Sequence, residues 1–329
     1  MKYSIRLSIK LIFCTGIVLL LLNSCGRLDL LAPALVAIAK GDGETVADTT
    51  SGSHQTDELG WAEPLYQRNG LDSEPHYSLV HGQIVFVSDS AGSKDIWTIN
   101  SDGSGLTQLT FSTGRETHPA WNPAGDRIVF TSDSLGNDDI WIMNADGSGL
   151  TQVTQDLADD AMPSFNPGGD QIVFTSNRSG NLDLWTIPAS GGTAVQVTTD
   201  PGDDYRPQWS PDGQDIAFVS DRYGYRDIWV ISVGSLVLER ITTVPSVNDM
   251  PAWSPSGGFI AFTSRRSGNW DIWIKEYRRT LPAIRVTLNT AYDTGPTWLP
   301  NQTGLIFTSD RGGDLDIWTM DFFQILQPQ

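Results

Sequence analysis

The sequence predicts an all-β fold, a six-bladed β-propeller built from four-stranded antiparallel blades. An Asp-Ile-Trp or Asp-Leu-Trp triplet recurs six times, with four spacings of 44 residues and a last spacing of 45. A phenylalanine lies eleven residues before each triplet tryptophan, and a proline lies eleven residues before each phenylalanine. A fixed period near 44 with several short strands in each unit is typical of propeller blades. The triplet tryptophans are Trp97, Trp141, Trp185, Trp229, Trp273 and Trp318.

The first segment, residues 1–24, is typical of a lipoprotein signal peptide. Three basic residues precede an apolar run over residues 11–22, which is too short to cross a bilayer comfortably. The run leads into Leu-Asn-Ser-Cys at residues 22–25, which resembles the lipobox of bacterial lipoproteins. We therefore expect Cys25 to carry the lipid and to be the only attachment to a membrane. The alternatives are an ordinary cleaved signal and an uncleaved anchor with a chance cysteine.

Residues 25–60 are predicted to be the lipidated cysteine and a flexible tether, because the stretch is rich in Gly, Asp, Thr and Ser. The propeller is assigned to residues 61–329. Without the three basic residues of the leader, the 21 basic residues fall to 18 against 39 acidic ones, a formal charge of −21. Such a surface repels phosphate backbones, so nucleic acid is excluded as a partner. Cys14 lies in the leader, which leaves no thiol for a disulfide or a cysteine nucleophile.

Each unit contains signals for two hairpins. The strand A proline has no N–H group, which suits an edge strand facing the central channel. Strand B is apolar on both faces, as expected of a blade packed between two neighbours. In the second unit, the strands and turns are expected at residues 119–121 (A), 122–125 (turn), 127–132 (B), 139–143 (C), 144–147 (turn) and 150–154 (D).

Closure of the ring involves both ends of the chain. The last unit has only residues 321–329 after its strand C. Leu65 and Tyr66 lie at the strand D offset before the first repeat proline. The N-terminal segment is therefore expected to complete blade six.

The repeats resemble those of the TolB-like propeller family. The resemblance is carried by Arg-Pro-Gln-Trp-Ser-Pro-Asp-Gly at residues 206–213 and Ile-Ala-Phe-Val-Ser-Asp-Arg-Tyr-Gly at residues 216–224, and it extends over about residues 70 to 327. It implies a six-bladed protein of the bacterial envelope that binds other proteins. The N-terminal α/β domain of TolB has no counterpart in the tether. A propeller repeat is specific for fold much more than for function.

No catalytic elbow, zinc-protease motif, phosphate loop or EF-hand spacing occurs in the sequence. One candidate site is a ring of mostly acidic residues, three positions before each strand A proline, in loops expected to open at the channel mouth. A ring of carboxylates predicts either a calcium site or an acidic mouth for a basic partner. The alternative is that each residue caps its own loop. The six residues are Asp72, Glu116, Asp160, Asp204, Asn248 and Asp293.

A second candidate is an aromatic and basic patch on the loops of blades four and five. Rigid aromatic side chains with arginines are the usual anchors of protein interfaces and sugar-stacking sites. The alternative is that these side chains cover neighbouring loops. The seven residues are Tyr205, Arg206, Tyr223, Tyr225, Arg226, Arg266 and Trp270.

These observations predict an exported, envelope-anchored lipoprotein whose propeller binds a protein or glycan partner without catalysis or a required cofactor. The alternative function is a lyase or hydrolase of polysaccharide that uses Glu116, His118 and Arg206 at the channel mouth. A metal site formed by His76 and His118, near Glu74 and Glu116, is a weaker hypothesis.

Overall fold

The computed structural model describes residues 61–66 and 69–321, and their regular structure is entirely β-strand. The signal peptide, Cys25 and the tether predicted over residues 1–60 lie outside the described residues. Within the described part of the chain, no helix is long and apolar enough to cross a membrane.

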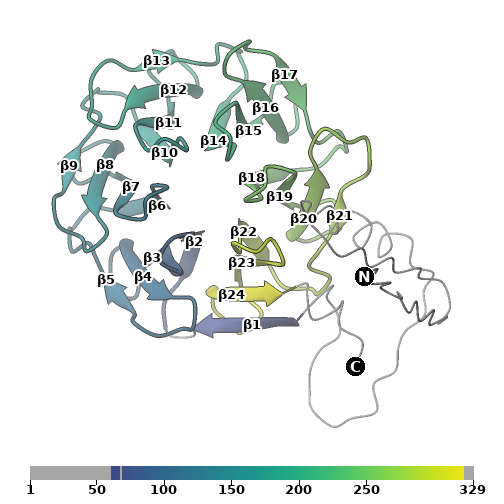
Figure 1. Cartoon of the computed structure of the whole chain (residues 1–329), viewed down its shortest axis with the longest axis horizontal. Coiled ribbons are helices and arrows are strands. Elements are labelled where there is room, and N and C mark those ends of the chain that lie inside the picture. Colours follow the sequence, from purple (N-terminus) through teal and green to yellow (C-terminus); the bar gives the residue numbers. More distant parts are fainter. Residues whose placement is uncertain (1–60, 67–68, 322–329) are drawn as a thin grey trace, which may run out of the picture. The chain divides into compact units, whose positions relative to one another are not determined.

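Six four-stranded antiparallel sheets surround a central opening, as predicted (Figure 1). Blade one contains β2 (Asp72–Tyr77), β3 (Gln83–Ser88), β4 (Asp95–Asn100) and β5 (Thr107–Gln108). Blade two contains β6 (Glu116–Trp121), β7 (Arg127–Ser132), β8 (Asp139–Asn144) and β9 (Thr151–Gln152). Blade three contains β10 (Asp160–Phe165), β11 (Gln171–Ser176), β12 (Asp183–Pro188) and β13 (Val195–Gln196). In each blade the first strand faces the opening.

The second half of the ring repeats this order. Blade four contains β14 (Asp204–Trp209), β15 (Asp215–Ser220), β16 (Asp227–Ser232) and β17 (Leu238–Arg240). Blade five contains β18 (Asn248–Trp253), β19 (Phe259–Ser264), β20 (Asp271–Glu276) and β21 (Ile284–Arg285). Blade six contains β22 (Asp293–Trp298), β23 (Gly304–Ser309), β24 (Asp316–Asp321) and β1 (Trp61–Tyr66).

The ring is closed by the N-terminal strand, as the sequence indicates. β1 pairs antiparallel with β24, with Ala62 opposite Met320 and Pro64 opposite Trp318. Leu65 and Tyr66 pack on the buried cluster that also contains Phe86 of blade one. The first and last described strands therefore lie in one sheet.

The strand boundaries in blade two differ from the prediction mainly at strands A and D, the first and last strands of the unit. Strand A begins three residues earlier, at Glu116, and strand D is limited to two residues. Strand D ends early because the Thr154 hydroxyl, and not a main-chain carbonyl, accepts the N–H of Ile140 at 2.9 Å. Short outer strands leave little unpaired edge for association with other chains.

The hydrophobic core lies between blades. The repeat phenylalanines are all at most 1% exposed, and one cluster joins Val85 and Ile96 of blade one to Ile128 and Phe130 of blade two. Each sheet is thus apolar on both faces because both faces are covered by neighbours. The blades fix the inner strands around one axis, which is where the candidate site lies.

Candidate functional site

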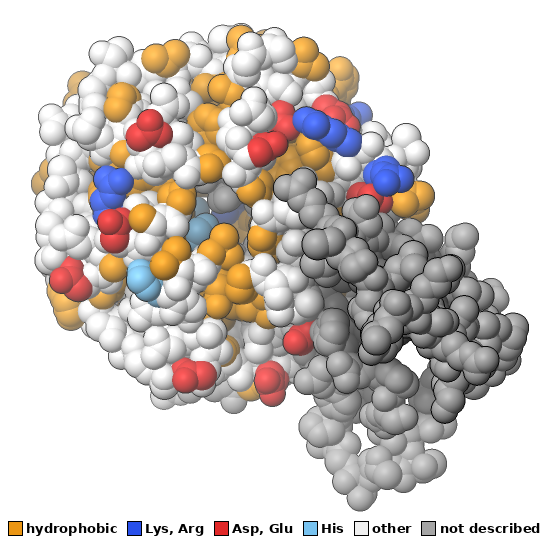
Figure 2. Space-filling view, viewed as in Figure 1, with side chains coloured by type: hydrophobic (Ala, Val, Ile, Leu, Met, Phe, Trp, Pro, Cys, Tyr) orange, Lys and Arg blue, Asp and Glu red, His pale blue; other side chains and the backbone are white. Residues whose placement is uncertain are grey.

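A cavity of about 350 Å³ occupies the centre of the propeller. It extends along the inner strands of all six blades, from the third residue of each strand to the turn that follows. Hydrophobic side chains gather around the central opening, and histidine is visible inside it (Figure 2). We call the end of the propeller with these A–B turns the A–B face, and the opposite end, where the loops between blades lie, the D–A face.

The third residue of every inner strand adopts a left-handed backbone, with φ between 52° and 60°. The pairing of the inner strand with its neighbour shifts register at this point in every blade, so the residue is a β-bulge. A left-handed conformation costs a non-glycine residue about 1 kcal/mol. The backbone is shared, but the six side chains differ: Glu74, His118, Met162, Arg206, Met250 and Gly295.

The bulge removes the N–H of this third residue from the strand ladder, and the blades do not all satisfy it in the same way. Met162 donates to the Thr131 hydroxyl of the preceding blade at 3.1 Å. His118 donates instead to Glu74 Oε2 at 2.7 Å. The carboxylate of one bulge residue therefore holds the backbone of the next.

Glu74 and His118 also contact each other through their side chains, with Nε2 of His118 3.4 Å from Oε1 of Glu74. Burial raises the pKa of Glu74, but His118, Arg206 and the His118 N–H together bring that pKa below its ordinary value. Burial lowers the pKa of His118, and Glu74 offsets only part of this effect. We assign a charged Glu74 and a neutral His118 with its proton on Nε2, the nitrogen nearest the carboxylate.

Arg206 of blade four faces this pair, since β2 and β14 lie on opposite sides of the opening (Figure 1). Its Nε is 3.0 Å from Oδ1 of Asp249, and Oδ2 of Asp249 is 3.6 Å from Nη1 of Arg226. The Arg226 guanidinium lies 5.8 Å from the centre of the Tyr205 ring. The Asp249 carboxylate thus fixes the direction of Arg206.

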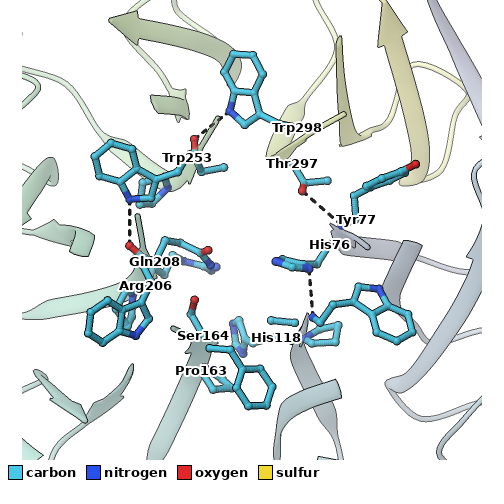
Figure 3. Close-up of a pocket in the computed structure, with 18 of the residues that line it drawn as sticks. His76, Tyr77, His118, Pro163, Ser164, Arg206, Gln208, Trp253, Thr297 and Trp298 are labelled. Atoms are coloured by element: carbon cyan, nitrogen blue, oxygen red, sulfur yellow. Dashed lines mark hydrogen bonds between the residues drawn. The ribbon is translucent and has the colours of Figure 1, made fainter. Parts of the chain in front are cut away.

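The fifth residue of each inner strand forms a second ring, and several of its side chains converge on the cavity (Figure 3). His76 Nδ1 accepts the N–H of Trp121 at 3.2 Å, so its proton is on Nε2. Burial lowers the pKa of His76 to about 4, so the ring is neutral at pH 7. The six residues of this ring are His76, Ala120, Ser164, Gln208, Ala252 and Thr297.

The two rings divide the cavity wall by chemistry. Blades one and four, which face each other, carry the charged Glu74 and Arg206 at the first level and the neutral polar His76 and Gln208 at the second. Blade five contributes the apolar Met250 and Ala252 to the two rings, and the prolines of all six inner strands complete the apolar wall. This arrangement suits an amphipathic ligand held between two polar walls.

The ring of acidic residues predicted at the channel mouth does not converge. Each of its six members begins an inner strand and is at most 2% exposed. Asp160, Asp204 and Asp293 are ion-paired to an arginine at the end of strand B of the same blade. Among the residues that the structure describes, no three His, Cys, Asp or Glu side chains are placed to hold a metal ion.

The two members in blades one and two follow a different pattern, because Ser90 and Ser134 replace the arginine there. Glu116 accepts hydrogen bonds from Ser112 and from Ser132, at 2.5 and 3.0 Å, through one oxygen. Burial raises the pKa of Glu116. Asn248 keeps the arginine and accepts from Arg266 at 2.7 Å. Asp160, Asp204, Asn248 and Asp293 thus connect the start of strand A to the residues that follow strand B, and Asn248 also donates to Asp227 of blade four at 3.1 Å.

The aromatic and basic patch predicted on blades four and five separates into three groups. Tyr205, Arg206 and Arg226 gather around Asp249, as described above. Tyr223 stacks on Trp229 with ring centres 5.6 Å apart and has the Arg240 guanidinium over it, while Tyr225 is exposed. A role of these residues in partner binding stays a prediction.

The remaining two patch residues lie on blade five. Trp270 contacts Tyr292 edge-on at 5.9 Å and has the Arg265 guanidinium 5.6 Å from its ring centre. Arg266 lies over Phe262 and Trp273, and burial lowers its pKa. Its contacts make Arg266 part of the blade packing.

The three residues of the alternative catalytic hypothesis are not assembled as predicted. His118 and Arg206 line the cavity, whereas the Glu116 carboxylate is held by two serines at the start of its strand. The carboxylate beside His118 is Glu74, which the sequence associated with His76 and His118 only as part of a metal site. The catalytic hypothesis missed it together with Asp249 and Gln208. The side chain before the repeat proline differs from unit to unit, and this variation in the sequence could have identified Glu74.

The family model for the TolB beta propeller domain matches residues 113–206 and 206–324. TolB from Acinetobacter baumannii superposes with a TM-score of 0.65 at 22% identity, over 73% of this chain and 63% of that chain. The putative TolB from Agrobacterium tumefaciens gives 0.61 at 18% identity, over 78% of this chain and 92% of that chain. An oligogalacturonate lyase in complex with manganese gives 0.60 at 11% identity, over 83% and 96%. No curated protein matches the sequence.

Proposed function

Because the chain belongs to the TolB β-propeller family, we propose that it is a non-catalytic binding module whose central cavity receives a segment of a protein partner. The observation that carries the proposal is the pair of rings on the inner strands. Six equivalent backbone positions carry six different side chains around one cavity of about 350 Å³. Features shared by all blades serve the fold, while differences concentrated at one place favour a ligand site.

A protein segment suits the cavity better than a glycan. Sugars stack on exposed faces of aromatic rings. The rings that line the cavity include Trp121, Trp209 and Trp298, which are between 4% and 9% exposed and offer little open face. Proline rings and the exposed side chain of Leu79 surround the A–B end instead, which favours apolar peptide side chains.

The proposal places the protein in the bacterial envelope. Export follows from the leader of residues 1–24, and lipid attachment follows from the lipobox that ends at Cys25. Cys25→Ala should abolish incorporation of labelled palmitate and release the protein from membranes. Retention of the label in this variant would place the lipid elsewhere.

Site-specific photocrosslinking in intact cells tests the binding site. A photoreactive phenylalanine analogue at Leu79, at the A–B end of the cavity, should give an adduct with a protein. The same group at Leu157, which is 97% exposed in a loop of the D–A face, is the matched control. An adduct that is equally abundant at both positions, or that persists when the cavity is filled by Ala252→Phe, would count against the proposal.

A second candidate function is cleavage of an acidic polysaccharide. It is favoured by the neutral His118 imidazole beside a carboxylate, which is an arrangement suited to proton transfer. Incubation of the purified protein with polygalacturonate, followed by the absorbance of unsaturated ends and by reducing-sugar release, separates the two functions. Turnover that His118→Gln abolishes would favour the enzyme.

A further inference from the structure

The cavity contains more hydrogen-bond donors than acceptors among the groups that have no partner within the described chain. Arg206 forms its ion pair with Asp249 through Nε, which leaves the Nη groups as donors for a ligand. Nε2–H of His76 is a donor because Nδ1 already accepts from Trp121. The amide of Gln208 adds a further donor, and both side chains point into the cavity (Figure 3).

Fewer acceptors remain in the same cavity, chiefly Nδ1 of His118 and the amide oxygen of Gln208. Glu74 faces Arg206 from across the channel, but its two oxygens are occupied by the backbone N–H and the imidazole of His118. The Thr297 hydroxyl accepts the N–H of Tyr77. A ligand that matches the remaining groups must therefore supply acceptors, and the guanidinium favours one that is anionic.

Resting on the proposed function, we propose that the bound segment is an apolar peptide that carries a carboxylate, with Arg206 as its ionic partner and Gln208 and His76 as neutral donors. Asp249 is the positioning residue, because its ion pair with Nε holds the guanidinium at the cavity wall. The apolar parts of the peptide contact Met250, Ala252 and the proline rings. A guanidinium in a partly buried site is well suited to a carboxylate.

The test uses two small probes that differ only in charge. Acetyl-leucyl-glutamate methylamide and acetyl-leucyl-glutamine methylamide are titrated against the full-length protein in detergent, and binding is measured by saturation-transfer NMR. The carboxylate probe should bind at least about tenfold more tightly than the amide, as expected for charge-assisted hydrogen bonds.

Arg206→Met should remove this preference. Methionine is the residue at the same left-handed position in blades three and five, so the backbone tolerates it. Arg115→Met is the matched control, because Arg115 lies outside the cavity lining and its loss changes the net charge equally. The preference should persist in this control.

The outcomes distinguish the inference from the proposed function. Equal binding of both probes to the wild type, with loss of both in Ala252→Phe, overturns the carboxylate and leaves the binding cavity intact. A preference that survives Arg206→Met overturns the role of Arg206. Failure of both probes to bind at tens of millimolar overturns the inference, while the crosslink from Leu79 decides the proposed function independently.

Discussion

Arg222 donates to both carboxylate oxygens of Asp204, at 2.9 and 2.8 Å, while its guanidinium lies 4.8 Å from the centre of the Trp229 ring. This contact connects the first residue of strand A to the end of strand B and to the tryptophan of strand C. Equivalent arginines occur in blades three, five and six. The acidic residue at the start of the strand therefore belongs to the construction of the blade.

Arg222→Ala should lower the free energy of unfolding by about 3 kcal/mol, because it leaves the Asp204 carboxyl buried without its cation. Denaturation by urea measures the change. The control is Arg115→Ala, which breaks an ion pair to Asp138 of similar length at a half-exposed site and should cost less than about 1 kcal/mol. Equal losses in the two variants would contradict this account of the strand start.

His76 should make stability depend on pH between about 6.5 and 4. Its pKa is about 4 in the folded protein and about 6.5 in the unfolded chain, so only the unfolded chain binds the proton in this interval. The free energy of unfolding should therefore fall as the pH falls from 6.5 to 4, by up to about 3 kcal/mol. His76→Asn keeps an acceptor for Trp121 and should remove this slope. Identical slopes in both proteins would rule out His76 as the cause.

Closure by β1 should contribute strongly to stability. Replacing residues 61–66 by a Gly-Ser stretch of the same length removes the partner of β24 and the packing of Leu65 and Tyr66. The loss of this burial is expected to be about 3 kcal/mol, which corresponds to a fall in Tm of about 6 °C or more. Calorimetry measures it. An unchanged Tm would show that the ring is closed without β1.

Calcium should not stabilise the propeller. The six residues of the predicted acidic ring are buried, and no three His, Cys, Asp or Glu side chains of the described residues are placed to hold a metal ion. The Tm should be the same in millimolar calcium and in chelator. A rise in Tm of several degrees in calcium would indicate that the propeller binds the cation.

The fold could be predicted from the sequence because several independent features of the repeat all indicate a propeller blade. The period, the proline of the inner strand and the apolar strand B all follow from a blade that is buried on both faces and has an edge at the channel. The pairing of β1 with β24 was also accessible, since Leu65 and Tyr66 occupy the offset of a strand D. These features are local or periodic.

The candidate site could be predicted only in part. Arg206 and His118 were identified, but the acidic residue at each strand start was placed at an open mouth, although it recurs in every unit as a structural residue does. The left-handed residue before each proline was missed because a residue in that place is normally extended. Contacts between neighbouring blades, such as that of Glu74 with His118, join residues 44 positions apart and have no signal within one repeat.

The central claim is that the cavity receives the partner. The most direct test measures the affinity of the partner protein, captured through Leu79, for the wild type and for Ala252→Phe. This substitution narrows the cavity with no change in charge. Leu157→Phe is the control, and thermal melts verify that both variants are folded. We predict that Ala252→Phe weakens binding at least about tenfold, a loss of about 1.4 kcal/mol, while Leu157→Phe binds as the wild type does. Unchanged affinity in a folded Ala252→Phe protein would contradict the claim.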